Sequence, residues 1–539
     1  LPGLTRLLNK LPFYSTKATS AINAYGEAAF LKPGHPPQIG RGEQGLIFID
    51  DFEGTRTSID LRFPFVAWAL ASTPQGNAKF PEATLTDSID YNFNRAKLAW
   101  YNIEPNLQDK NSSNNPLRRN LAELSDPRVR QVFTNELFPQ RTTNITDVQA
   151  ATFDLAFYPT EKGPYNFETR PGEFTANGRL TKPANRWGGI MRAIDQTDFE
   201  TGNIEFFEIW MQDPFILNPG SRGGKFFLNL GNVSEDVLKD GKRFYENGLN
   251  TPNIPAAVDS SNTWGKTPVN PIQITQAFSN DPNDRPFQDV GFDGLDDDAE
   301  RRKKGYILNR IAQNFGTSSP AFIQAQEDVA RDNYKWFRDN SFDQLGTGIL
   351  GRYKNHNNPQ GNSPVAVTGG GQFTPAATLY PDNEDLNRDN TLNETEAYYE
   401  YEVNLRPGMD VGITPYITDK RRVTVNAADG TTKTEDWFLF RIPIRGFTRK
   451  VGSIADFKSI RFARLYLTDF EDSVVIRMAR MDLVRNQWRQ FSFNLDTTGA
   501  YTPITNTAGT TFNTLAVNLE ENSSRQPVNY IMPPGVERV

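Results

Sequence analysis

Acidic and amide side chains between Asp385 and Glu396 have the spacing of a calcium-binding loop. Counted from Asp385, side-chain oxygens fall at positions one, three, five and nine, and Glu396 falls at position twelve. In such loops alternate side chains turn inward on a hard cation, and the glutamate at position twelve supplies further oxygen ligands. The sequence therefore predicts a structural calcium ion held by Asp385, Asn387, Asp389, Glu396 and the carbonyl group of Thr391.

One position of this loop departs from the pattern. Asn390 stands at position six, where glycine is usual. Asparagine is the residue that next best tolerates a left-handed backbone, so the turn itself remains feasible. Because no helix pattern precedes the loop, the alternative is an acidic turn that is exposed to solvent and holds no ion.

A second group of acids, Asp293 to Asp298, comes directly before a helical pattern over residues 299–315. Carboxylates in the first turn of a helix interact favourably with its dipole. We therefore interpret this group as helix capping. Glu205 and Glu208 form a pair of the kind used in glycoside hydrolysis, but sequence cannot show the carboxylate separation of about 5 to 9.5 Å that this chemistry needs.

Other chemistries lack the residues that they need. The 539 residues include no cysteine and only two histidines, His35 and His356. This excludes disulfides and cysteine nucleophiles, and it leaves almost no material for histidine-based zinc sites or Ser-His-Asp catalysis. The net charge is −7 with both signs interspersed, so a nucleic-acid partner is not expected. We predict that the protein is not an enzyme.

Strand patterns cluster before and after a helix-rich middle. Apolar or alternating runs of strand length are found at 46–49, 152–158, 187–194, 203–211, 225–230, 397–405, 437–444, 459–467 and 474–484. In the last run, Val475, Arg477, Ala479, Met481 and Leu483 are expected on one side of the strand. Helices are expected to begin at 125–127, at Ser234, at 299 and at 319–320, the last reaching about Trp336.

This order predicts a mainly β protein, a jelly-roll-like β-sandwich with a large insertion of loops and helices. The sandwich is expected over 45–230 and 395–490, and the insertion with the calcium-like loop over 231–394. Residues 1–44 are expected to be a lead-in, with a neighbouring barrel strand as one option, and 491–539 a linker to neighbouring structure. The chain begins at Leu1 and not at Met, so we expect a processed product or a part of a longer protein.

Many short blocks occur in an order that resembles the SprA/Sov family. One block is Arg186-Trp187-Gly188-Gly189-Ile190-Met191-Arg192, and another is Ile49-Asp50-Asp51-Phe52-Glu53-Gly54. The others are 70–74, 158–159, 162–166, 198–200, 210–215, 230–238, 288–291, 293–295, 361–363 and the calcium-like loop. No single block is specific, and the resemblance lies in their number and order over roughly residues 8–535.

The resemblance implies a central, largely soluble part of the outer-membrane translocon of the type 9 secretion system, which many members use in gliding motility. The family protein is several times longer, and its giant outer-membrane β-barrel has about 36 strands, most of which are missing here. The implied location is the cell outer membrane, on the extracellular side in preference to the periplasmic side. The implied partners are secreted cargo proteins with type 9 C-terminal signals, a PorV-type outer-membrane barrel and a plug protein.

Two functions therefore stand side by side. The first is a structural and cargo-interaction module of a protein-conducting channel, in which Trp210 and Phe215 are candidate contacts, although both also suit a core. The second is a secreted carbohydrate-binding or glycosidase-like β-sandwich, which must bind or cleave soluble sugars.

Overall fold

The computed structural model describes residues 2–13, 15–17 and 58–485, the last range with gaps at 140–147, 247, 252–254, 256, 272–277, 279–280, 282 and 363–380. The expected strand at 46–49, most of the lead-in and the expected linker at 491–539 lie outside the described residues. The chain divides into two compact units, one of residues 1–54 with 530–539 and one of residues 55–529. In the described part of the first unit, α1 (Pro2–Leu8) is a short helix.

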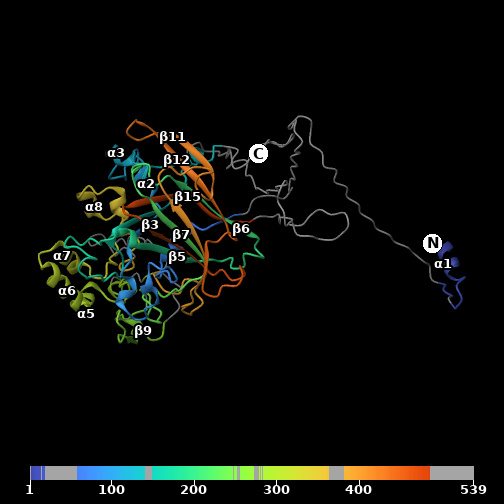
Figure 1. Ribbon diagram of the computed structural model, residues 1–539, viewed down its shortest axis with the longest axis horizontal. Helices are drawn as coiled ribbons and strands as arrows, with labels where there is room; N and C mark the ends of the chain where they lie inside the picture. Colours follow the sequence, from blue (N-terminus) through green and yellow to red (C-terminus); the bar gives the residue numbers. More distant parts are fainter. Residues whose placement is uncertain are drawn as a thin grey trace. The chain divides into compact units, whose positions relative to one another are not determined.

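The second unit is built on two antiparallel sheets (Figure 1). In the described residues, the first sheet has seven strands, in the order β11 (Ile417–Asn426), β12 (Thr432–Pro443), β6 (Ile204–Gln212), β15 (Val474–Arg485), β4 (Phe153–Lys162) and β3 (Ala96–Tyr101), with β1 (Ser58–Asp60) also paired to β15. The second has six, in the order β13 (Arg449–Val451), β10 (Ala397–Leu405), β7 (Gly224–Asn232), β14 (Phe462–Thr468), β5 (Trp187–Ala193) and β2 (Ala69–Leu70).

Strands from the two ends of this unit alternate within both sheets. In the first sheet β6 lies between β12 and β15, and in the second β7 lies between β10 and β14. Each sheet therefore contains strands from before and after the helix-rich middle. Neither group of strands has a sheet of its own among the described residues.

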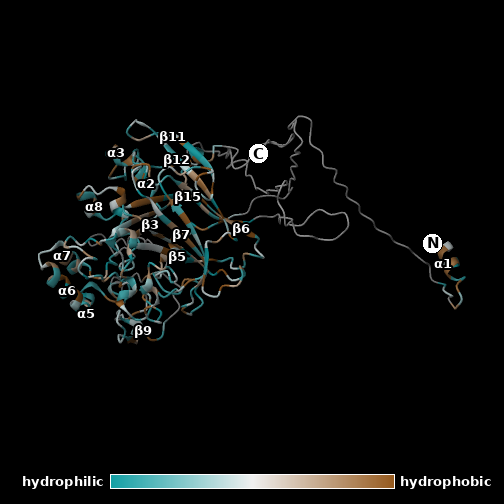
Figure 2. Cartoon of the chain, in the orientation of Figure 1, coloured by the Kyte–Doolittle hydropathy of each residue, from teal (hydrophilic) through white to brown (hydrophobic). Residues whose placement is uncertain are grey.

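The two sheets pack face to face on one hydrophobic core. Phe157 and Phe207 of the first sheet and Leu228 and Leu465 of the second belong to the same buried cluster. The sheets approach closely at Gly188 on β5, where an added Cβ would lie 2.9 Å from the Cβ of Leu98 on β3. The absence of a side chain at Gly188 thus allows the layers to meet. Figure 2 shows hydrophobic residues along β15 and a hydrophilic β11 at the sheet edge.

The helix-rich middle packs against this sandwich. Its helices are α5 (Asp297–Lys303), α6 (Gly305–Phe315), α7 (Pro320–Glu327), α8 (Asn340–Gln344) and α9 (Ile349–Tyr353), with a small hairpin of β8 (Val258–Asp259) and β9 (Thr267–Pro268). Phe244, Trp264, Phe292 and Ile307 from this region join the main hydrophobic cluster. The region is thus a packed part of the unit, and removing it would open the core of the sandwich.

Short helical turns fill the remaining connections. They are α2 (Pro105–Gln108), α3 (Leu121–Leu124) and α4 (Thr134–Leu137), with 3-10 turns η1 (Phe65–Ala67), η2 (Pro81–Thr84), η3 (Ile89–Asn92), η4 (Pro183–Asn185) and η5 (Arg285–Phe287). Within the described ranges, no helix has both the length and the apolar composition to cross a membrane.

The helix predictions are right in part. Ser319 caps α7 by accepting the backbone N–H of Phe322, as predicted, but α7 ends at Glu327 and not near Trp336. The helix expected over 299–315 is two helices, which meet at Lys304. No helix begins at 125–127, because the Asp126 carboxylate accepts the nearby N–H of Arg128 and closes a turn instead.

The helix expected from Ser234 is also absent. The backbone N–H groups of Val237 and Leu238 both donate to the Glu384 carboxylate, at 2.7 and 3.3 Å. In a helix that begins after Ser234, the Leu238 N–H would donate to the Ser234 carbonyl group. That carbonyl instead accepts the Ser72 hydroxyl at 2.6 Å, so tertiary hydrogen bonds, including those to a distant acid, replace the helix that local sequence favours.

The expected alternation of β15 is wrong over part of the strand. Its pairing with β6 shifts between Met478 and Arg480, which is the mark of a β-bulge. Because a bulge adds one residue, the core-facing set changes from Val474, Ile476 and Met478 to Met481 and Leu483. The sequence also did not predict β11, whose run of charged residues hides its strand pattern.

Candidate functional sites

The calcium-like loop is a tight turn closed by its own side chains. The Asp385 carboxylate accepts the backbone N–H groups of Asp389 and Asn390, each at 3.0 Å. The Asp389 carboxylate accepts the Asn387 amide at 2.9 Å and the Thr391 backbone N–H at 2.9 Å. The structure thus brings together four of the five predicted ligand residues.

Both ends of the predicted ligand set are ion-paired with arginine. Asp385 Oδ2 lies 2.8 Å from Nη1 of Arg243. The two Glu396 oxygens accept hydrogen bonds from Nη1 and Nη2 of Arg464, both at 2.9 Å. Oε1 of Glu396 also accepts the backbone N–H of Ser234. A calcium ion in this loop would have to compete with Arg464 for Glu396, so the occupancy of the loop stays a prediction.

Two further acids in this region bind backbone N–H groups of other segments. Glu384 accepts the N–H of Phe244 at 2.8 Å in addition to the two donors described above. Glu235 accepts the N–H groups of Leu386 and Asn393, at 2.6 and 3.1 Å. Burial raises the pKa of Glu235 to about 7. The acids of residues 234–246 and 384–396 thus fasten these two segments to each other.

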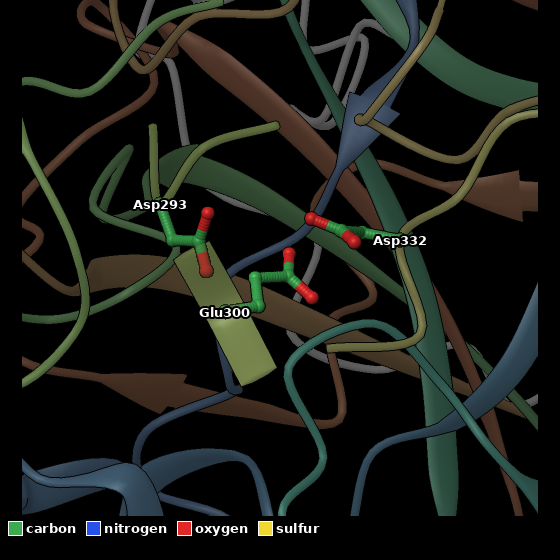
Figure 3. A group of neighbouring side chains, drawn as sticks. All are labelled: Asp293, Glu300 and Asp332. Atoms are coloured by element: carbon green, nitrogen blue, oxygen red, sulfur yellow. The ribbon is translucent and has the colours of Figure 1, made fainter. Parts of the chain in front are cut away.

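A second group of carboxylates is fully buried in the helix-rich middle. This carboxylate centre consists of Asp293, Glu300 and Asp332, each with 0% of its surface exposed. One oxygen from each residue lies within 4.8 Å of the other two. Figure 3 shows the three carboxylates pointing toward one another from three different segments.

Local structure fixes each member of the carboxylate centre. Asp293 lies in the turn before α5, where Oδ1 accepts the N–H of Leu295 at 3.0 Å. Glu300 is on α5, whose N-terminus is capped by Asp296 through the Ala299 N–H. Asp332 follows α7, and its carbonyl group accepts the N–H of Gln360 at 2.8 Å.

Several oxygens of the carboxylate centre accept no hydrogen bond. Among the described residues, no donor reaches Oδ2 of Asp293, Oε2 of Glu300 or Oδ2 of Asp332 with acceptable geometry. The side-chain amide of Gln360, which is also buried, has one terminal atom 3.2 Å from Oε1 of Glu300 and 3.1 Å from Oδ1 of Asp332. With nitrogen at that position, the amide donates to both carboxylates.

Burial dominates the electrostatics of the carboxylate centre. It raises the pKa of Asp293 to about 7, although Lys304 acts in the opposite direction. Burial and the negative charges of Asp332 and Asp293 hold the pKa of Glu300 well above its usual range. Burial and the charge of Asp293 do the same to Asp332, and the Tyr165 hydroxyl offsets part of this rise.

A second set of acids shares Glu300 with the centre. Oxygens of Asp297, Glu300 and Asp328 also lie within 4.8 Å of one another, but Asp297 and Asp328 are only half-buried. Both have partners, because Asp297 accepts the Asn333 amide at 3.0 Å and Asp328 accepts the Arg331 N–H at 2.6 Å. The set is therefore better satisfied than the fully buried centre.

The carboxylate centre offers only hard oxygen ligands, which suit calcium or magnesium. No substrate can reach its fully buried oxygens in this conformation, so its geometry suits a structural role. The interpretation of 293–298 as helix capping holds for Asp296 and is incomplete for Asp293. Sequence reasoning missed Glu300 and Asp332, and the available signal was Asp293 between two glycines, Gly291 and Gly294, that both have positive φ.

The other sequence candidates are structural in the described fold. Glu208 is buried, and its Oε1 lies 2.6 Å from Nε of Arg441 on the neighbouring strand β12. Trp210 and Phe215 are 2% and 3% exposed. They are therefore core residues, and the suggestion that they contact cargo is wrong for this conformation.

Residues 306–539 match the family SprA_N, which is described as a motility related/secretion protein. The matched range includes Asp332, Gln360 and the calcium-like loop, and it begins after Asp293 and Glu300. No curated protein matches the sequence.

Proposed function

Because this chain belongs to the SprA/Sov family of motility-related and secretion proteins, we propose that it is a structural and interaction module of the outer-membrane translocon of the type 9 secretion system. The family match is the observation that carries the proposal. The family is described by secretion and motility and not by a reaction, which agrees with a non-catalytic role.

The strand order supports a jelly-roll sandwich as the form of this module. Numbering the strands β4, β5, β6, β7, β10, β12, β14 and β15 from one to eight gives the order 1-8-3-6 in one sheet and 2-7-4-5 in the other. Two four-stranded antiparallel sheets between which the chain passes in this order form the double Greek key of a jelly roll. All pairings within the two sheets are antiparallel, as this topology requires.

We place the module in water at the mouth of the channel, on the extracellular side of the outer membrane. There it would shape the passage for cargo proteins with type 9 C-terminal signals, beside a PorV-type barrel and a plug protein. The edge strand β11 supports a hydrated position, because its hydrophilic side chains include Lys420, Arg421 and Arg422. Charged residues on a sheet edge also oppose unwanted strand pairing.

Site-specific labelling in cells tests the location and the partners together. This sequence has no cysteine, so single cysteines can be introduced at Leu345 and Ile413, which are 78% and 76% exposed. Leu228, which is fully buried, supplies the matched control. The variants are made in the full-length protein, and a membrane-impermeant maleimide is applied to intact cells.

An extracellular module predicts labelling at Leu345→Cys and Ile413→Cys in intact cells and little labelling at Leu228→Cys. Labelling that requires rupture of the outer membrane would refute the extracellular placement. A photo-reactive residue at the same exposed positions should then form adducts with cargo that carries a type 9 signal, and fewer with cargo that lacks it. Binding or cleavage of soluble polysaccharides by the purified protein would instead favour the carbohydrate-binding alternative.

A further inference from the structure

We propose that the carboxylate centre of Asp293, Glu300 and Asp332 binds one divalent cation, and that this cation is calcium. The site is distinct from the calcium-like loop in both position and ligands. Its role would be structural, because it would join the turn and helix that carry Asp293 and Glu300 to the separate segment that carries Asp332 (Figure 3).

The first argument concerns uncompensated charge. Three carboxylates with no exposed surface each have one oxygen within 4.8 Å of an oxygen of the other two, and such groups need a counter-charge when ionised. Lys304 is a buried cation that acts on Asp293, but its Nζ donates to the carbonyl of Thr263 at 2.7 Å and lies over the rings of Phe167 and Trp264. Its ammonium group is thus engaged elsewhere, and one oxygen of each carboxylate still accepts no hydrogen bond.

The second argument is the orientation of the carboxylate oxygens that accept no hydrogen bond. One oxygen from each carboxylate accepts no hydrogen bond, and Figure 3 shows the three groups facing a common space. A single cation in that space would satisfy all three at once, which no single proton can do. Buried unsatisfied acceptors are rare in native proteins and indicate a missing partner.

The third argument comes from Gln360, a neutral and buried residue outside the acidic cluster. One terminal atom of its amide lies 3.2 Å from Oε1 of Glu300 and 3.1 Å from Oδ1 of Asp332, and nitrogen at that position donates to both. Rotation of the amide by half a turn would present its oxygen to the centre instead. With an ion bound, that oxygen would be a fourth oxygen ligand, in addition to the three carboxylates.

The ligand set favours calcium over magnesium. Magnesium requires near-ideal octahedral geometry and usually keeps several water ligands, whereas calcium accepts six to eight oxygens in irregular geometry. Carboxylates that can each supply two oxygens, together with an amide oxygen, give calcium enough ligands without water. The cation would then fasten α5 to the segments that contain Asp332 and Gln360.

Refolding in the presence and absence of calcium tests the proposal. Because the centre is buried, the 539-residue chain is refolded from denaturant either in calcium or in chelator, and bound metal is measured by mass spectrometry after removal of free ions. We expect calcium to be retained and to raise Tm by about 2 °C or more. Terbium, a luminescent substitute for calcium, should be sensitised by the adjacent Tyr165 and Trp264, whose ring centroids are 6.3 Å apart.

Substitutions separate a cation site from a group of protonated acids. Asp293→Asn and Asp332→Asn should abolish the calcium-dependent rise in Tm and reduce terbium emission. In chelator these variants should be at least as stable as the unsubstituted protein, because each removes a buried repulsive charge. Asp298→Asn is the matched control, since Asp298 is on the same helix but its side chain is 76% exposed.

The outcomes are mutually exclusive. Retention of the full calcium-dependent shift in Asp293→Asn and Asp332→Asn would assign calcium to another site and overturn the proposal. Absence of bound metal and of any shift with calcium, magnesium or manganese would show that protons neutralise the centre, and would also overturn it. Loss of the shift in both centre variants, but not in Asp298→Asn or Asp385→Ala, would support it.

Discussion

Replacing Glu396 by glutamine should reveal how strongly the second sheet depends on one buried ion pair. Glu396 lies just before β10, and its partner Arg464 is on β14, two strands away across β7. The Arg464 side chain is fully buried and that of Glu396 is 5% exposed. Burial lowers the pKa of the Arg464 guanidinium, but the charge and hydrogen bonds of Glu396 more than offset this and raise it.

The magnitude follows from the contacts that are lost. Glu396 accepts two charge-assisted hydrogen bonds from Arg464, worth about 1.5 to 3 kcal/mol each, whereas glutamine offers one neutral acceptor and places an N–H₂ group against a donor. Arg464 retains Asn229 Oδ1 at 2.9 Å and Ser72 Oγ at 3.2 Å, but both are uncharged. Breaking a buried pair from one side typically costs about 3 to 5 kcal/mol, and we expect a loss of about 3 kcal/mol here.

Chemical denaturation monitored by both fluorescence and circular dichroism measures the loss. The matched control is Glu471→Gln, which removes the partner of Arg222 in an ion pair whose side chains are 80% and 44% exposed. We expect this control to change the free energy of unfolding by less than about 0.5 kcal/mol. Equal effects of Glu396→Gln and Glu471→Gln would refute the reasoning, because burial would then not determine the cost.

Three further predictions concern separate parts of the chain. If the calcium-like loop holds an ion, Asp385→Ala should lower Tm more in calcium than in chelator, whereas an equal loss in both would assign the effect to the ion pair with Arg243. Burial lowers the pKa of His356 from 6.5 to about 4. Between pH 6.5 and 4 the folded state therefore binds fewer protons than the unfolded state. Stability should therefore fall as the pH drops from 6.5 toward 4, and His356→Phe should weaken this dependence in denaturation curves measured at each pH. Gly265→Ala should destabilise the protein by about 1 to 3 kcal/mol in chemical denaturation, because its Cβ would lie 1.7 Å from the carbonyl oxygen of Asp293, and an unchanged stability would show that this turn yields easily.

The sequence predicted most strands because their patterns are local. Apolar runs at 187–194, 203–211 and 397–405 correspond closely to β5, β6 and β10. The bulge in β15 was not predictable, because it arises from pairing with β6 and leaves no mark in the order of residues. The helix expected at Ser234 failed for a related reason, since Glu384 accepts its donors from about 150 residues away, as the bond to Val237 shows.

The carboxylate centre shows the same limit for sites. Asp293 and Glu300 are close in sequence, but Asp332 and Gln360 join them only through the path of the chain after α7 and α9. Spacing rules predict sites within one loop, and they directed attention to residues 385–396. A site assembled from distant segments has no fixed spacing, so it could be found only from the structure.

The alternation of early and late strands has a consequence for how the protein is made. β4 pairs with β3 early in synthesis but acquires its second neighbour only when β15 exists, and Arg477 on β15 donates to the carbonyl of Pro127, 350 residues earlier in the chain. Contacts of such high sequence separation make folding slow and leave unpaired strand edges exposed until the last strand arrives. A ribosome or an export channel releases this chain from its N-terminus. An open, aggregation-prone intermediate would therefore persist until the last strand is released. We expect that a chain truncated before Val474 would need chaperones and would be degraded, whereas one that ends after Arg485 could close its sheets.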